Sequence, residues 1–167
     1  MFTIYTGNGK GKTTASLGLL IRAKGAGFNC YLVKFLKKQE NSENSILSKL
    51  GIPYKMFGSN KFIIDKPTKI DKEEASKAIM YVQKLIDTKK IDLLVLDEIN
   101  LLIYYKLFSI RKIKQIISVC EEKEIELVFT GRYASKDIIE IADLVSEIKE
   151  IKHYYNTGIK ARKGIEY

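Results

Sequence analysis

This chain has few of the residues from which metal centres, disulfide frameworks and histidine-based catalytic sites are built. Its 167 residues include two cysteines, Cys30 and Cys120, and one histidine, His153. Both cysteines lie in apolar stretches without a CxxC spacing, so we expect buried free thiols in a reducing compartment. A single histidine excludes a histidine-rich metal site, and the sequence supports no Ser/His/Asp or Cys/His catalytic set. Because its neighbours are polar, we expect a structural or surface role for His153.

Long hydrophobic runs are also missing. No apolar run approaches the ~18 residues that a membrane span needs. The chain enters a strand at once, without the basic stretch and apolar core of a signal peptide. We therefore expect a cytoplasmic protein with no membrane partner. Domains typically hold ~100–200 residues, so we expect one domain over residues 1–167.

Acidic residues are outnumbered, with 20 Asp and Glu against 29 Lys and Arg and a formal net charge of +9. A basic balance favours polyanionic partners such as nucleotides or nucleic acid. The lysines are spread along the chain, however, and their clusters are short, which favours a solvated lysine-rich surface. A nucleic-acid module that uses ATP as a regulator would rest on charge alone, because no motif typical of nucleic-acid binding is recognised. We expect no nucleic-acid partner.

The most informative stretch is TGNGKGKTT, residues 6–14. The usual phosphate-binding loop reads Gly, four residues, then Gly-Lys-Ser/Thr. Counted back from Gly11, the first glycine belongs at position 6, but Thr6 stands there and the glycine comes one residue later. Glycines let backbone N–H groups approach phosphate oxygens, and the following helix adds the positive end of its dipole. Lys12 supplies a point charge and Thr13 a hydroxyl for magnesium.

A flexible glycine turn is the alternative interpretation of this stretch, but it leaves Gly-Lys-Thr-Thr before an apolar helix unexplained. The sequence therefore predicts a phosphate-binding loop. All nine of its residues are candidate nucleotide contacts: Thr6, Gly7, Asn8, Gly9, Lys10, Gly11, Lys12, Thr13 and Thr14.

Apolar patterning predicts strands that alternate with helices. Strands are expected at residues 2–5, 30–35, 54–57, 91–96, 126–129 and 144–151. Helices are expected at 13–24, within 37–48, at 71–89, around 110–120 and at 136–142, with a long loop over 58–72. The first helix is apolar nearly all round, which predicts burial. The alternation predicts an α/β fold with a mostly parallel sheet covered by helices on both faces.

Polar residues follow the predicted strands at the edge where open α/β sheets bind ligands. Asp97 and Glu98 come after the strand at 91–96, where an acid commonly holds magnesium near the loop. Their alternative role is a helix N-cap with a first-turn acid. Arg132 is either a phosphate contact or a surface ion pair. Arg22, inside the apolar first helix, needs a phosphate or an internal carboxylate as its partner.

Several blocks together resemble the P-loop ATP:corrinoid adenosyltransferase family. The blocks are YTGNGKGKTTA (5–15) with Arg22 following, VKF (33–35), LVLDE (94–98) with Asn100, and VFTGR (128–132). The tail adds DLVSE (143–147), KH (152–153), GIKA (158–161) and GIEY (164–167). The resemblance covers nearly the whole chain, and the loop spelling and the tail together are specific to this family.

The resemblance implies a P-loop NTPase-like (RecA-like) fold. It implies transfer of the 5′-deoxyadenosyl group of ATP to the Co(I) of a reduced corrinoid, either cob(I)alamin or a cobinamide-type precursor, with release of the whole triphosphate. It also implies Mg²⁺ (or Mn²⁺), an electron donor for Co(II) reduction, and a homodimer. No general base is required, because the cobalt nucleophile has no proton to lose.

The family pattern also assigns roles to residues of this sequence. Nucleotide contacts fall on Gly9, Gly11, Lys12, Thr13, Thr14, Arg22 and Arg132. Catalytic roles fall on Lys12, Thr13 and Glu98, and metal ligation on Thr13, Glu98 and Asp97.

Two features depart from the family pattern. Members often carry an N-terminal extension, whereas the first strand here begins at residue 2, and many have an aromatic pair ending in Trp, which this chain lacks. The corresponding stretch reads KFII (61–64), so Phe62 is the expected aromatic of the corrinoid site.

The alternative function is a P-loop ATPase or kinase acting at the γ-phosphate, with Asp97 and Glu98 as magnesium ligand and base. The apolar stretch 101–105 belongs to the core or to an interface, and we favour the core.

Overall fold

The computed structural model describes residues 1–59, 63 and 66–167, and Phe62 therefore lies outside the described residues. The strands are β1 Phe2–Thr6, β2 Cys30–Lys34, β3 Tyr54–Met56, β4 Leu93–Asp97, β5 Glu126–Thr130 and β6 Leu144–Glu147. The α-helices are α1 Lys12–Gly25, α2 Ser42–Lys49, α3 Lys69–Thr88, α4 Ile99–Tyr104, α5 Ile110–Glu122 and α6 Lys136–Ile139. A 3₁₀ turn, Tyr154–Thr157, lies in the tail.

The six strands form one sheet in the order β3-β2-β4-β5-β1-β6, and every neighbouring pair is parallel. The strand that precedes the glycine-rich loop, β1, is separated from the strand that ends in Asp97, β4, by β5 alone. Because parallel strands all end at the same edge, the loops after β1, β2, β4 and β5 gather there. The predicted α/β fold with a parallel sheet is confirmed.

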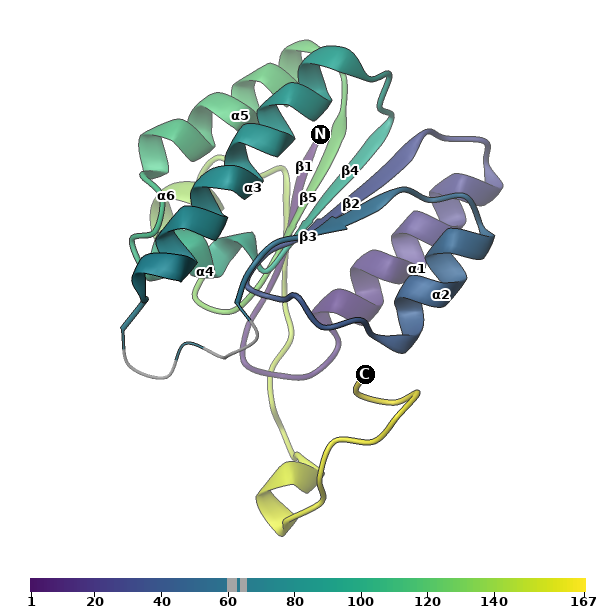
Figure 1. Ribbon diagram of the computed structural model, residues 1–167, viewed down its shortest axis with the longest axis vertical. Coiled ribbons are helices and arrows are strands. Elements are labelled where there is room, and N and C mark those ends of the chain that lie inside the picture. Colours follow the sequence, from purple (N-terminus) through teal and green to yellow (C-terminus); the bar gives the residue numbers. More distant parts are fainter. Residues whose placement is uncertain (60–62, 64–65) are drawn as a thin grey trace.

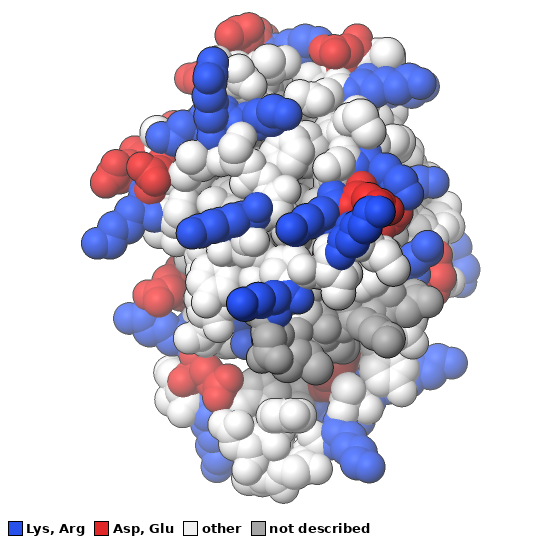
Figure 2. All heavy atoms as spheres, turned by 60° about the vertical axis from the view of Figure 1, so that its left-hand side comes forward, with Lys and Arg blue, Asp and Glu red and all other residues white. Residues whose placement is uncertain are grey.

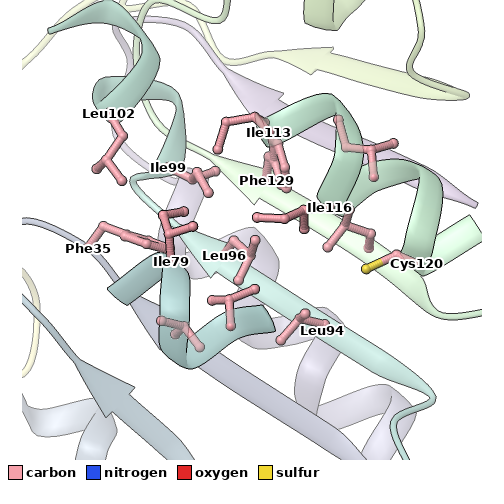
Figure 3. Packing of buried hydrophobic residues seen from close by; sticks show 14 of the residues in the cluster. Phe35, Ile79, Leu94, Leu96, Ile99, Leu102, Ile113, Ile116, Cys120 and Phe129 are labelled. Carbon is pink, nitrogen blue, oxygen red and sulfur yellow. The ribbon is translucent and has the colours of Figure 1, made fainter. Parts of the chain in front are cut away.

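Helices cover both faces of the sheet, with α3 to α6 on one side and α1 and α2 on the other (Figure 1). Figure 3 shows the larger core, where Ile79 of α3 and Ile116 of α5 lie against Leu94 and Leu96 of β4 and Phe129 of β5. Complete burial of such a side chain stabilises the fold by about 1.5–3 kcal/mol.

A second core lies on the opposite face of the sheet, and neighbouring residues of β4 and β5 belong to the two cores in turn. Leu93 and Val95 of β4 and Val128 of β5 point to the opposite face, where Leu20 of α1 and Leu47 of α2 cover them. Strands that are apolar on both faces are typical of a parallel sheet buried between helices.

The first helix is buried on one side only. Its buried residues are Lys12, Ser16, Leu20 and Ala23, spaced three or four apart, whereas Ile21 and Arg22 are exposed. The prediction that this helix is buried all round is therefore wrong, because the sheet covers only one of its sides and single exposed apolar residues are common. An exposed Arg22 needs no internal partner.

The helices and strands differ from the prediction at several places, among them α6, which ends at Ile139 rather than at residue 142. A capping box, in which Thr68 and Asp71 bond each other's backbone N–H groups, starts α3 two residues early. The last strand ends at Glu147 rather than continuing to residue 151. Helix α4 was not predicted. Its Leu102 is completely buried but its Tyr104 is 52% exposed, so the core interpretation of residues 101–105 holds only in part.

Two properties of the structure bear on membrane and nucleic-acid partners. None of the helices in the described part of the chain combines the length and apolar character that a bilayer crossing requires. On the face shown in Figure 2, Lys and Arg side chains are spread widely and interspersed with Asp and Glu. On that face the basic residues do not form one continuous patch.

Candidate active site

The glycine-rich loop after β1 fits closely against the segment that follows β6. Gly9 N donates to Ile148 O at 2.8 Å, and Ile148 N donates to Thr6 O at 2.8 Å. A Cβ at Gly7 would stand 2.4 Å from Ile148 O, and one at Gly9 would stand 2.7 Å from Lys149 O. Only glycine fits at these two positions, because a side chain would collide with backbone that cannot move aside.

The unusual spelling of the loop has a structural explanation. Gly7 has a φ of 98°, a conformation that side chains strongly disfavour, so the first obligatory glycine falls at position 7. Thr6 still belongs to β1, is buried, and accepts a hydrogen bond from Ala134 N at 3.3 Å through its hydroxyl. The threonine therefore joins β1 to the loop after β5.

Lys12 points into the loop that precedes it. Its ammonium donates to Gly7 O at 2.8 Å and to Gly9 O at 2.7 Å, and the residue is 8% exposed. Burial lowers the pKa of this ammonium, an effect that the nearby Glu98 carboxylate opposes. The loop therefore already holds a positive group, bound by the carbonyl oxygens of Gly7 and Gly9.

Asp97 ends β4 with both carboxylate oxygens engaged. Its Oδ1 accepts the hydroxyls of Thr13 at 2.9 Å and Thr130 at 2.6 Å, and its Oδ2 lies 3.4 Å from Lys37 Nζ. The side chain is completely buried, and burial alone would raise its pKa. The attraction of Lys37 and the two hydroxyl donors outweigh burial and hold the pKa of Asp97 below its usual value. Asp97 is thus a buried, charged acceptor.

Glu98 has one engaged oxygen and one free oxygen. Its Oε1 lies 3.6 Å from Lys37 Nζ, whereas its Oε2 is buried without a hydrogen-bond partner among the described residues. Burial and the adjacent Asp97 raise the pKa of this carboxyl, and Lys37 opposes them. A buried, unpaired carboxylate oxygen beside a hydroxyl-bearing loop suits a cation.

The backbone around Glu98 is specialised for this position. Glu98 has a left-handed φ of 66°, and its N–H donates to the Thr130 hydroxyl at 2.9 Å. A Cβ at Gly131 would lie 3.2 Å from Glu98 Oε2. Glu98 occupies the N-cap position of α4, but its side chain makes no capping hydrogen bond to the described residues. The simple N-cap alternative is therefore not supported.

Two cavities adjoin at this edge of the sheet and share Lys37, Glu98 and Arg132. The larger, of about 650 Å³, has the loop on one side and the start of α2 and the C-terminal residues on the others. The smaller, of about 320 Å³, is more apolar. Its other lining residues are Leu36, Ile63, Leu101, Tyr105 and Tyr133. Both volumes fall in the range of small-molecule sites.

The C-terminal tail closes one side of the larger cavity. Lys10 Nζ donates to Tyr154 Oη and to Glu166 Oε1, both at 2.7 Å, and Ser42 Oγ donates to Tyr167 O at 2.8 Å. Arg162 lies 3.3 Å from the same Glu166 carboxylate. Hydrogen bonds from Arg162, Lys10 and Tyr154 hold the pKa of Glu166 well below its usual value. In Figure 1 the tail returns to the loop-side ends of α1 and α2.

The structure brings most of the predicted site residues together. Residues 8–14, Glu98 and Arg132 line the larger cavity, and Asp97 lies behind Thr13. Within the described part of the chain, Arg22 lines neither cavity, because it stands exposed in the last turn of α1. His153 does line the larger cavity, although its ring nitrogen is also bonded to a tail backbone N–H.

Two residues of the candidate site were given no individual role in the sequence analysis. Thr130 organises Asp97 and Glu98, and Lys37 contacts both acids. Each lies at or just after the carboxyl end of a predicted strand. Their position at this edge of the sheet could therefore be predicted, but their contacts with Asp97 and Glu98 could not.

The fold and the site define a nucleotide-binding α/β protein of the P-loop NTPase-like class. Over residues 1–167 the chain matches the family described as ATP:corrinoid adenosyltransferase BtuR/CobO/CobP, and it belongs to that family. The resemblance predicted from the sequence is confirmed.

Individual relatives in this family are similar in sequence to this chain along most of their length. The corrinoid adenosyltransferase of Escherichia coli (strain K12) is 30% identical over 166 residues, covering 98% of this chain and 84% of the relative. Corrinoid adenosyltransferase CobA of Salmonella typhimurium is 29% identical over 165 residues, with the same coverage. A corrinoid adenosyltransferase of Sinorhizobium sp. is 31% identical over 171 residues, covering 100% of this chain and 80% of the relative.

Proposed function

We propose that this member of the family transfers the adenosyl group of ATP to a corrinoid, with ATP in the larger cavity and the corrinoid at the smaller one. The observation that carries the proposal is that the two cavities share Lys37, Glu98 and Arg132. A bond between cobalt and the 5′ carbon can form only where the two substrates meet. In this proposal the two substrates would meet at the boundary that the two cavities share.

The loop would hold the triphosphate as a leaving group. Lys12 and the start of α1 line the larger cavity, and both bring positive charge to it. Negative charge grows on the triphosphate as the carbon–oxygen bond breaks, so contacts that strengthen at that moment lower the barrier. Glu98 then has no proton to remove, which distinguishes this chemistry from γ-phosphate hydrolysis.

The residues present fit a magnesium or manganese ion. We propose the Thr13 hydroxyl oxygen and Glu98 Oε2 as its protein ligands, because the Thr13 proton is donated to Asp97 and Glu98 Oε2 has no other partner among the described residues. Asp97 would orient Thr13 without binding the ion itself. Mg²⁺ in such sites uses one or two protein ligands plus phosphate oxygens and water. When bound, the ion neutralises charge on the triphosphate.

The smaller cavity would receive one edge of the corrinoid. Its volume of about 320 Å³ is near the lower limit for drug-sized ligands, so a larger corrinoid would extend beyond it. Tyr105 and Tyr133 supply aromatic surface in a chain without Trp. Ile63 lines this cavity, and we retain Phe62, its sequence neighbour, as a proposed corrinoid contact.

Other expectations remain proposals about the whole protein. They are a single domain over residues 1–167, an electron donor that reduces Co(II), a homodimer and a cytoplasmic location. The single domain is supported by the sheet, because β1 near one end of the chain pairs with β6 near the other.

Filling the smaller cavity tests the assignment of substrates. Leu101→Trp should raise the KM for the corrinoid about tenfold or more through steric exclusion, while the Kd for ATP stays near the wild-type value. Leu50→Trp, at an exposed position of the α2 C-cap, is the matched control. An unchanged corrinoid KM together with weakened ATP binding would reverse the assignment of the two cavities.

A further inference from the structure

Lys37 occupies a position that the activity described above does not explain. Its ammonium lies 3.4 Å from Asp97 Oδ2 and 3.6 Å from Glu98 Oε1, and its side chain is 27% exposed. It lines both cavities. A cation therefore sits between the two acids at the boundary where the substrates are proposed to meet.

The backbone before Lys37 is shaped to place it there. Leu36 adopts a left-handed φ of 56°, which turns the chain sharply at the end of β2. Lys37 N donates to Phe57 O at 3.1 Å. A Cβ at Gly58 would lie 2.6 Å from both Leu36 C and Lys37 N, so this close approach requires glycine. A strained turn held by its neighbours is typical of functional positions.

Other cations near this edge have different partners. Lys34 is buried but donates to Glu43 at 2.8 Å and Asn44 at 2.9 Å. Lys12 is held by loop carbonyls. Among the described residues, Lys37 is the lysine or arginine whose side-chain nitrogen lies within 4.0 Å of both Asp97 and Glu98.

We propose that Lys37 is a resident counter-ion that couples metal binding to nucleotide binding. In the nucleotide-free protein its charge offsets that of Asp97 and Glu98, so a free divalent ion meets a reduced negative potential. An incoming triphosphate offers the ammonium a second anionic partner across the same cavity. The Glu98 carboxylate is then freed from this competing cation and is available to the ion that arrives with the nucleotide. This inference rests on the proposed nucleotide site.

The coupling predicts opposite effects on two affinities when the charge is removed. Lys37→Met keeps an unbranched side chain but loses the charge. It should tighten Mn²⁺ binding in the absence of nucleotide about tenfold, because the acids lose their competitor. It should weaken binding of metal-free ATP about tenfold, because the anion loses a cation. Lys37→Arg, which keeps the charge, should bind Mn²⁺ and ATP with affinities close to those of the wild-type protein.

Both affinities are measured directly, Mn²⁺ by the electron paramagnetic resonance signal of the free ion and ATP by calorimetry in EDTA. Lys38→Met is the matched control, since Lys38 is the exposed neighbouring lysine, and it should leave both values unchanged. Losses of both affinities together in Lys37→Met, or no change in either, would overturn the role of Lys37. Failure of the wild-type protein to bind ATP with Mn²⁺ would instead refute the nucleotide site itself.

Discussion

At the scale of single residues, the segment after β6 determines where glycine must stand in the phosphate-binding loop. The backbone of Ile148 and Lys149 leaves no room for a Cβ at Gly7 or Gly9. Position 6 lies outside this close contact, because Thr6 still belongs to β1 and its hydroxyl accepts a hydrogen bond from Ala134 N. The loop pattern in the sequence predicts phosphate binding, whereas the position of its glycines depends on this distant segment.

Lys12 provides the sharpest test of the loop at this scale. Lys12→Ala removes the ammonium proposed to stabilise the departing triphosphate, so kcat for adenosylation should fall about 10²–10³-fold, as when other preorganised electrostatic groups are removed. Steady-state kinetics with ATP and a chemically reduced corrinoid would measure this loss.

Lys38→Ala, at an exposed lysine, is the control for the loss of one positive charge. Wild-type turnover in Lys12→Ala would contradict the role given to the loop. A thermal unfolding curve close to wild type would show that the variant is folded.

At the scale of elements, the strands and long helices could be predicted because apolar periodicity records burial. Five of the differences lie at places where another interaction decides the chain path. They are the capping box before α3, the left-handed Glu98 before α4, the loop contact of Ile148 after β6, the single buried side of α1 and the exposed end of α4. None of these leaves a clear periodic signal in the sequence.

The tail is the element whose role is most open to test. Glu166 bonds both Lys10 of the loop and Arg162 of the tail. Glu166→Gln weakens both contacts, so the tail should leave the loop more often and trypsin should cut after Arg162 and Lys163 about two- to fivefold faster. Limited proteolysis followed by mass spectrometry would give the rates.

Glu150→Gln is the matched control, because Glu150 is an exposed tail residue that bonds Asn156 rather than the loop. Saturating ATP should slow cleavage of the wild-type tail, since the tail lines the larger cavity. Equal cleavage rates in Glu166→Gln and wild type would mean that this cluster does not hold the tail in place.

At the scale of the whole molecule, the order of strands brings the chemistry to one edge. The sequence predicted a parallel sheet and therefore a shared edge, but not that β5 would lie between β1 and β4. That order places Thr130 against Asp97 and brings Glu98 toward Thr13 through their common neighbours. Strand order depends on long-range pairing, which a single sequence does not encode in any local pattern.

The fate of ATP tests the central claim most directly. The protein is incubated without oxygen with ATP, Mg²⁺ and a chemically reduced corrinoid, and the phosphate products and the cobalt species are quantified together. Adenosyl transfer predicts one intact triphosphate for each light-sensitive alkylcobalt product formed. ADP and inorganic phosphate with an unchanged corrinoid would contradict the account and favour an enzyme that acts at the γ-phosphate.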